Sequence, residues 1–229
     1  MSSRRYGEIK HVPVNPALRD YLLRSATPLD PVLESLIDRT AELGDPSVML
    51  VPAEQAALLT MLTRLVGAGT AVDVGTFTGC SALAMARGLR PGGRVISCDI
   101  TDKWLHIARE HWDRAGAMDR IDFRLGPADE TLRALPDETS VDIAFLDADK
   151  EGYETYYRRL VPLLRTGGLL VVDNVFFNGY VLAPELAPEG IERTSAAALR
   201  SFNALLAADE RMDTVMLPIS DGLTIARKR

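Results

Sequence analysis

Acidic and amide side chains stand directly after two stretches that have the composition of buried strands. Asp147 follows Val141–Leu146, and the pair Asp173-Asn174 follows residues 168–172. Neighbouring parallel strands lie about 4.8 Å apart, so oxygen donors at their ends can converge on one point. Oxygen donors without His or Cys suit a hard cation such as Mg²⁺, which keeps positions open for substrate and water. We therefore predict a divalent-cation site at Asp147, Asp173 and Asn174.

The alternative for these side chains is ordinary turn chemistry, because Asp and Asn are common where a strand ends. Turn residues rarely bring so many oxygens to one edge of a sheet, which favours the cation site. Asp149 points elsewhere if Asp147 points into the site, so we exclude Asp149 as a ligand.

A loop that contains glycine follows the first predicted strand, with the sequence Asp73-Val-Gly75-Thr-Phe-Thr-Gly79-Cys-Ser81. Glycines permit a tight turn and a close approach of the backbone to a ligand. The spacing differs from the Gly-x-Gly-x-x-Gly loop with which dinucleotide enzymes hold a pyrophosphate. Asp73 would repel a phosphate and attract a cation. Taken alone, the loop is equally consistent with a strand-to-helix turn that needs glycine.

Asp99 ends the second predicted strand. Doubly wound folds place an acid on ribose hydroxyls about 20 residues beyond the glycine loop, and Asp99 occupies that place. Taken alone, Asp99 is more simply a solvated or capping residue at a strand end. The loop and the acid together indicate a nucleoside ligand that needs no pyrophosphate. S-adenosylmethionine, a nucleoside with a cationic sulfonium, fits this description.

The elements that must position these residues alternate between strand and helix. This alternation predicts right-handed crossovers and a Rossmann-like, doubly wound, mostly parallel sheet, whose ligands bind beyond the carboxyl ends of the strands. We expect parallel strands at residues 71–75, 94–99, 121–125, 141–146 and 168–172. We expect helices between and after them at residues 81–89, 103–115, 153–164 and 196–208, with a short one beyond Ala128. Segments 213–217 and 223–226 should form an antiparallel hairpin at one edge, which gives seven strands in an α/β fold.

The chain is expected to form a single domain, residues 1–229, because it has no internal repeat and no linker. Residues 49–229 would form the core, and residues 1–48 a helical N-terminal extension. The extension has apolar positions at helical spacing: Leu22, Leu23, Leu33, Leu36 and Ile37. From the residues alone, packing on the chain's own sheet and packing on a second copy are equally plausible.

Composition excludes several classes of protein. The 229 residues are 47% hydrophobic and 25% charged, which suits a globular protein. The net charge of −6 argues against nucleic acid or an anionic membrane as partner. No uninterrupted apolar run is expected to cross a bilayer, and the N-terminus lacks the apolar segment of a secretory signal. Cys80 and Cys98 fit no zinc or redox spacing, so we expect buried, reduced thiols in a cytoplasmic protein.

With these motifs in this order, the sequence resembles the class I, cation-dependent O-methyltransferases of the catechol and caffeoyl-CoA type. The resemblance runs from about Met49 to the C-terminus. It implies S-adenosylmethionine as methyl donor, Mg²⁺ or a similar divalent ion (Ca²⁺ or Mn²⁺), phenolic substrates with vicinal hydroxyls, and a homodimer. Its motifs are Gly75-Thr-Phe-Thr-Gly79, Asp147-Ala-Asp149-Lys150 with Tyr153 and Tyr156, Gly167-Gly168 leading to Asp173-Asn174, and Asp221-Gly222-Leu223.

The resemblance also implies roles for individual residues. Lys150 would be the catalytic base, while Asp147, Asp173 and Asn174 would hold the metal. The cofactor would be lined by Met49, Val51, Asp73, Gly75, Phe77, Ser81, Asp99, Ile100, Ala128 and Asp147.

The sequence departs from the family pattern at several positions. The family usually has Glu where Asp73 stands, and it often has Trp near Phe177. Residues before Met49 match poorly, in a region that helps the family to select its substrate. Tyr153 and Tyr156 have the helical spacing of core residues, so we leave both out of the site.

The sequence therefore predicts an O-methyltransferase that acts on a catechol-like small molecule by direct displacement, with Lys150 accepting the proton. An NAD-dependent oxidoreductase is the first alternative, disfavoured by the missing pyrophosphate loop. A catalytically silent nucleoside-binding protein is the second alternative. It would keep the glycine loop and Asp99 but would not need the metal ligands.

Overall fold

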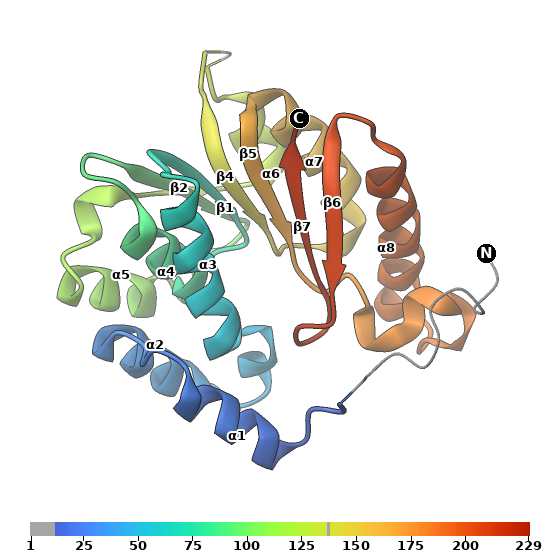
Figure 1. Ribbon diagram of the computed structural model, residues 1–229, viewed down its shortest axis with the longest axis horizontal. Helices are drawn as coiled ribbons and strands as arrows, with labels where there is room; N and C mark the ends of the chain where they lie inside the picture. Colours follow the sequence, from blue (N-terminus) through green and yellow to red (C-terminus); the bar gives the residue numbers. More distant parts are fainter. Residues whose placement is uncertain (1–11, 137) are drawn as a thin grey trace.

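The computed structural model describes residues 12–136 and 138–229, and the first residues of the predicted N-terminal extension lie outside this range. A single seven-stranded sheet crosses the molecule in the order β3-β2-β1-β4-β5-β7-β6 (Figure 1). Strands β1 to β5 are parallel, and β7 is antiparallel to both of its neighbours. The predicted fold class and the C-terminal hairpin are thus confirmed. The strands are β1 Thr70–Val74, β2 Arg94–Asp99, β3 Ile121–Leu125, β4 Val141–Leu146, β5 Leu164–Val172, β6 Met212–Leu217 and β7 Leu223–Lys228.

Helices cover both faces of the sheet (Figure 1). One face packs against α2 to α5 and the other against α6 to α8. The helices are α1 Pro16–Ser25, α2 Pro31–Ala41, α3 Ala53–Leu65, α4 Cys80–Gly88, α5 Leu105–Arg114, α6 Ala128–Arg133, α7 Tyr153–Leu163 and α8 Ile191–Ala208. Short 3₁₀ turns are η2 Asp45–Met49, η3 Met118–Arg120, η4 Lys150–Gly152, η5 Phe177–Leu182 and η6 Pro184–Leu186.

Two elements, β5 and α8, begin at least four residues earlier than the sequence predicts. Strand β5 starts at Leu164 rather than at residue 168, because the chain leaves α7 directly in extended conformation and its register with β4 shifts after Val141. Helix α8 starts at Ile191 rather than at residue 196. Its first turn buries no side chain before Ser195, so the apolar periodicity that marks a helix begins one turn late.

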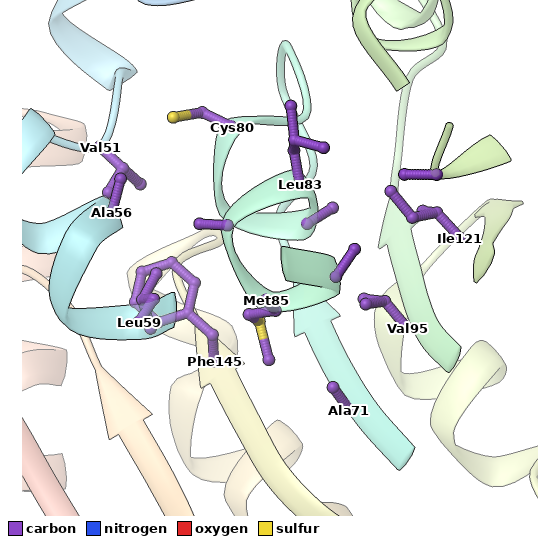
Figure 2. Packing of buried hydrophobic residues seen from close by; sticks show 14 of the residues in the cluster. Val51, Ala56, Leu59, Ala71, Cys80, Leu83, Met85, Val95, Ile121 and Phe145 are labelled. Carbon is purple, nitrogen blue, oxygen red and sulfur yellow. The ribbon is translucent and has the colours of Figure 1, made fainter. Parts of the chain in front are cut away.

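The core on the α2–α5 face joins α3 and α4 to the middle strands (Figure 2). Leu59 of α3, Leu83 of α4 and Phe145 of β4 are fully buried in this cluster. Side chains alternate between the two faces along each strand. Ala71, Phe145 and Val171 belong to this cluster, so the residue two positions later in each strand points to the same face.

The two helices of the N-terminal extension, α1 and α2, behave differently. Leu33 and Leu36 of α2 are buried in the core on the α2–α5 face, so this part of the extension packs on its own domain. Helix α1 has no buried residue, and Leu22 and Leu23 are exposed. Packing on the chain's own domain is thus observed for Leu33 and Leu36 but not for Leu22 and Leu23.

Contrary to the sequence-based expectation, one segment is long and apolar enough to cross a membrane. It is Asp45–Leu65, with a mean hydropathy of 1.2. One such segment is weak support for insertion, because helices of water-exposed domains can pass the same test. Here the segment is broken into η2 and α3, and α3 has 13 residues, about 20 Å, against a bilayer core of about 30 Å. Ala56 and Leu59 of α3 are part of the protein core.

Cys80 and Cys98 are free and buried, as predicted. Burial raises the pKa of both thiols to about 12. Neither side chain therefore supplies a thiolate nucleophile at neutral pH.

Candidate active site

Four carboxylates stand at the carboxyl ends of neighbouring strands: Asp73 on β1, Asp99 on β2, and Asp147 and Asp173 directly after β4 and β5. The strand ends are held in register by backbone bonds. Asp147 N donates to Val74 O at 2.9 Å, and Asp173 N donates to Leu146 O at 3.1 Å. By strand alternation, Asp73, Asp147 and Asp173 point to the α2–α5 face. All four acids therefore lie at the same edge of the sheet, where its parallel strands end.

The loop after β1 needs glycine at two positions. Gly75 has φ of +103°, and a Cβ there would overlap the carbonyl oxygen of Asp147. Gly79 has φ of +83°, and a Cβ there would lie 2.7 Å from the Trp112 ring. The first glycine lets β1 and the segment after β4 approach closely, and the second lets α4 pack on α5. The loop therefore shapes the site and is more than a simple turn.

Asp99 also holds this loop in place. Its Oδ2 accepts hydrogen bonds from Thr76 N at 3.0 Å and Phe77 N at 2.9 Å, and its Oδ1 accepts from Thr101 N at 3.1 Å. Phe77 has φ of +49° and packs edge-on against Trp104. Sequence reasoning assigned Asp99 to a ribose. The structure adds a structural role, because the same carboxylate fixes an uncommon loop conformation.

Asp73 is fully buried beside the loop. Its Oδ2 accepts a hydrogen bond from Ser97 Oγ at 2.6 Å, and its Oδ1 has no partner among the described residues. Burial raises the pKa of Asp73 to about 7, while hydrogen bonds from Ser97 and Ser81 oppose the rise and the charge of Asp147 adds to it. A buried acid with one unpaired oxygen is suited to receive a cationic group of a ligand.

Replacing Asp73 by asparagine is expected to stabilise the ligand-free protein above neutral pH. The pKa of Asp73 rises from 3.8 to about 7 on folding, so between these values the folded state binds more protons than the unfolded state. The free energy of unfolding of the wild type therefore falls as pH rises through this window. At about pH 8 the variant should be more stable by about 1–4 kcal/mol, and the difference should shrink toward pH 4. Denaturant unfolding at both pH values measures it.

The control for this experiment is Asp102→Asn, which changes an exposed acid a few residues after β2. Its effect on stability should be small and should not vary with pH. A stability difference for Asp73→Asn that stays constant between the two pH values would contradict the buried-charge interpretation.

Lys150 lies between the acids and a buried tyrosine. Its Nζ donates to Asp147 Oδ1 at 3.0 Å and to Tyr153 Oη at 2.8 Å, and its side chain is 14% exposed. Tyr153 Oη in turn donates to Asp173 O at 3.3 Å. The ammonium group is thus held at the same edge of the sheet as the acids, in η4 directly after β4.

Tyr153 is a site residue that the sequence reasoning left out. Its ring is fully buried in the core on the α6–α8 face, as its helical spacing suggested, but its hydroxyl reaches Lys150. The sequence feature that could have identified Tyr153 as a site residue is its position three residues after Lys150. Asp149, excluded as a ligand, accepts a hydrogen bond from Tyr156 Oη at 2.6 Å.

Asp173 is buried next to Asp147. Burial and the charge of Asp147 together raise the pKa of Asp173 to about 7. Asp173 Oδ1 accepts from Asn174 N at 2.7 Å, and Asn174 has φ of +57°, a conformation that asparagine tolerates. Burial raises the pKa of Asp221, in the turn between β6 and β7, and hydrogen bonds from the Asn178 backbone and the Asn174 side chain oppose the rise. Acids from three elements thus crowd at this point.

The donor set fits a hard divalent cation. Two carboxylates repel each other across neighbouring strand ends, and a cation between them would relieve that repulsion. Asn174 would add a neutral oxygen. Within the described residues there is no group of three or more His, Cys, Asp or Glu side chains that could hold a metal, and the predicted set contains only two such residues, Asp147 and Asp173.

The other predicted cofactor residues come from several elements near the carboxyl ends of the strands. Ser81 lies in the first turn of α4 and Ala128 at the start of α6, and both are buried. Val51 is buried just before α3, whereas Met49 and Ile100 are exposed. The cavities of about 520 Å³ and 650 Å³ lie elsewhere, at the α8–β6 groove and at the amino ends of the strands.

The O-methyltransferase family model matches residues 24–229. The chain belongs to the O-methyltransferase family. It is 34% identical over 220 residues to the probable caffeoyl-CoA O-methyltransferase 1 of Dictyostelium discoideum, covering 95% of this chain and 94% of that protein. It is 39% identical over 229 residues to the catechol O-methyltransferase domain-containing protein 1 of Mus musculus, covering 99% and 85%.

A similar solved structure, the SAH-bound methyltransferase PaMTH1 of Podospora anserina, has a TM-score of 0.84 and 27% identity, covering 96% of this chain and 98% of that one. These comparisons therefore support the predicted family, the predicted enzyme class and S-adenosylmethionine as the methyl donor. This O-methyltransferase uses S-adenosylmethionine, and the alternatives of an NAD-dependent oxidoreductase and of a silent nucleoside-binding protein are wrong.

Proposed function

We propose that this O-methyltransferase requires a divalent cation, Mg²⁺ or one that replaces it such as Ca²⁺ or Mn²⁺, and methylates one hydroxyl of a catechol-like small molecule. The observation that carries the proposal is the meeting of Asp147, Asp173 and Asn174 beside Lys150 at the ends of β4 and β5. The names of the relatives, which mention catechol and caffeoyl-CoA, support the substrate class.

Different residues of the chain are assigned different roles in the reaction. A divalent cation held by Asp147, Asp173 and Asn174 would lower the pKa of a phenol hydroxyl and fix two vicinal oxygens. Lys150 accepts the hydroxyl proton at Nζ, where the hydroxyl of Tyr153 holds the side chain. The bond from the phenol oxygen to the methyl carbon forms as the bond from that carbon to the sulfonium sulfur breaks. We assign the amine of the methyl donor to Asp73 and its ribose to Asp99.

A panel of acceptors tests the proposed substrate class. Aromatic rings with two vicinal hydroxyls should be methylated about 100-fold faster than the same rings with one hydroxyl, because a single oxygen leaves the nucleophile poorly aligned. Methyl transfer to each acceptor is measured with labelled S-adenosylmethionine at saturating Mg²⁺. Equal or faster transfer to the single hydroxyl would refute the catechol assignment.

We also propose that the protein forms a homodimer through α1. This helix buries none of its residues, and Tyr21, Leu22 and Leu23 are 63%, 42% and 37% exposed. Exposed apolar side chains grouped on one helix are typical of an interface. Helix α1 lies on the side of the molecule where the carboxyl ends of the parallel strands are (Figure 1). A second copy would thus cover it close to the active site.

Light scattering is expected to give about twice the mass of one chain. Leu22→Asp combined with Leu23→Asp should return the particle to the mass of one chain, because charges on α1 cannot be buried without partners. Leu65→Asp is the control, since Leu65 is also exposed but lies at the end of α3. A wild-type particle with the mass of one chain would refute the dimer.

The remaining assignments are also proposals. We propose a single domain in the cytoplasm, supported by the free, buried thiols of Cys80 and Cys98, and no nucleic acid or membrane partner, supported by the net charge of −6.

A further inference from the structure

Gln55 is a buried polar residue that neither the sequence reasoning nor the proposed reaction uses. It lies in the first turn of α3 and has no solvent-exposed surface. Its Nε2 and Oε1 are both buried without a hydrogen-bond partner among the described residues. Buried amides in folded proteins are almost always paired, so an amide with two unpaired atoms needs an explanation.

The position of Gln55 on α3 explains why its amide has no partner within the core. Ala56, Leu59 and Thr63 follow it on the buried face of α3, so Gln55 is the residue of this face nearest to the start of the helix. Helix α3 covers the face of the sheet to which Asp173 points. The amide lies close enough to Asp173 to lower the pKa of that carboxyl, although it makes no hydrogen bond of normal geometry.

A role confined to packing does not explain this residue. At a site that needs only volume, an apolar side chain of the same length would fill the space without leaving polar atoms unpaired. Thr63 is a buried polar residue of α3 with a structural role only, and its polar group is paired. Its Oγ1 donates to Leu59 O at 2.7 Å. Gln55 keeps its amide unpaired on the helix that covers the face of the sheet to which Asp173 points.

We propose that Gln55 is a positioning residue, whose amide orients the Asp173 carboxylate for the divalent cation. This inference rests on the proposed cation dependence. The amide N–H groups can hold a carboxylate oxygen of Asp173, and the amide oxygen stays free for a water or substrate hydroxyl at the same point. Groups that hydrogen-bond to metal ligands commonly change cation affinity tenfold or more when they are removed.

The test replaces the amide by an apolar side chain of similar length, Gln55→Met. Cation affinity is measured with Mn²⁺ by electron paramagnetic resonance and with Mg²⁺ by calorimetry. Affinity for both ions should fall about 10- to 100-fold, while affinity for S-adenosylmethionine stays within about twofold. The midpoint of thermal unfolding without cation should stay the same or rise, because two unpaired buried polar atoms are removed.

A purely structural role gives the opposite pattern, a lower midpoint of unfolding with unchanged cation affinity, and that result would overturn the proposal. Thr63→Val is the matched control, because it removes a buried polar group from the same face of α3 and should leave cation affinity unchanged. Gln55→Leu replaces the first variant if that one does not fold.

The two possible failures are distinguishable. If the wild type binds neither Mn²⁺ nor Mg²⁺, the proposed cation dependence fails and the role of Gln55 fails with it. If the wild type binds them and Gln55→Met binds them equally well, only the positioning role is overturned.

Discussion

Replacing Lys150 by alanine is expected to reduce the turnover number about 10²- to 10⁴-fold, the usual range when acid–base assistance is lost. Lys150 Nζ is held by Asp147 and Tyr153 at the edge of the sheet where the methyl acceptor must lie. The dissociation constant for S-adenosylmethionine should change little, because Asp73 and Asp99, the acids assigned to the amine and the ribose of the donor, stand on β1 and β2. Steady-state kinetics and calorimetry on the same preparation measure both quantities.

The control for Lys150 separates a base from an ion-pair partner. Lys150→Arg keeps a positive charge next to Asp147, but a guanidinium cannot give up its proton in a protein. If Lys150 accepts the substrate proton, the arginine variant should be about as slow as the alanine variant. Near-normal turnover of either variant across neutral pH would show that Lys150 only pairs with Asp147.

Removing divalent cations is expected to abolish methyl transfer, and adding Mg²⁺ should restore it. A phenol has a pKa near 10, so almost none of it is ionised at neutral pH without help from a cation. The cation should also raise the midpoint of thermal unfolding, because it relieves the repulsion between Asp147 and Asp173 in the folded state only. Dialysis against a chelator, followed by activity and unfolding measurements, tests both effects.

Asp173→Ala provides the matching variant for the cation experiment. Its activity should be lost whether or not Mg²⁺ is added, while its affinity for S-adenosylmethionine should be largely kept. Full turnover of the dialysed wild type in the presence of chelator would contradict the cation requirement. Such a result would leave the family and the methyl donor unaffected, since these rest on the comparisons.

The alternation of strand and helix was readable from the sequence because it depends on short-range periodicity. Each parallel strand contains apolar residues and ends at, or just before, an acid or a glycine. The positions of Asp73, Asp99, Asp147 and Asp173 at one edge of the sheet therefore followed from the topology. The role of Lys150 was predicted from the family motif that follows β4, Asp147-Ala-Asp149-Lys150. The site residues that belong to strand ends were predictable for this reason.

Element boundaries were less predictable where local patterns are weak. The exposed first turn of α8 has no apolar periodicity, and β5 continues directly from α7 at Leu164. The insertion of β7 between β5 and β6 was also not predicted. Strand order depends on contacts between distant segments, which residue spacing along the chain does not record.

The polar contacts of Tyr153 and Gln55 could be recognised only in the folded structure. A tyrosine or a glutamine on the buried face of a helix has the same spacing whether its polar group is paired in the core or reaches a site. The hydroxyl of Tyr153 meets Lys150 because of how α7 packs on the sheet, and Gln55 lies near Asp173 because of how α3 packs on the other face. Packing angles arise from many long-range contacts together, so the polar partners of these two side chains could be read only from the assembled structure.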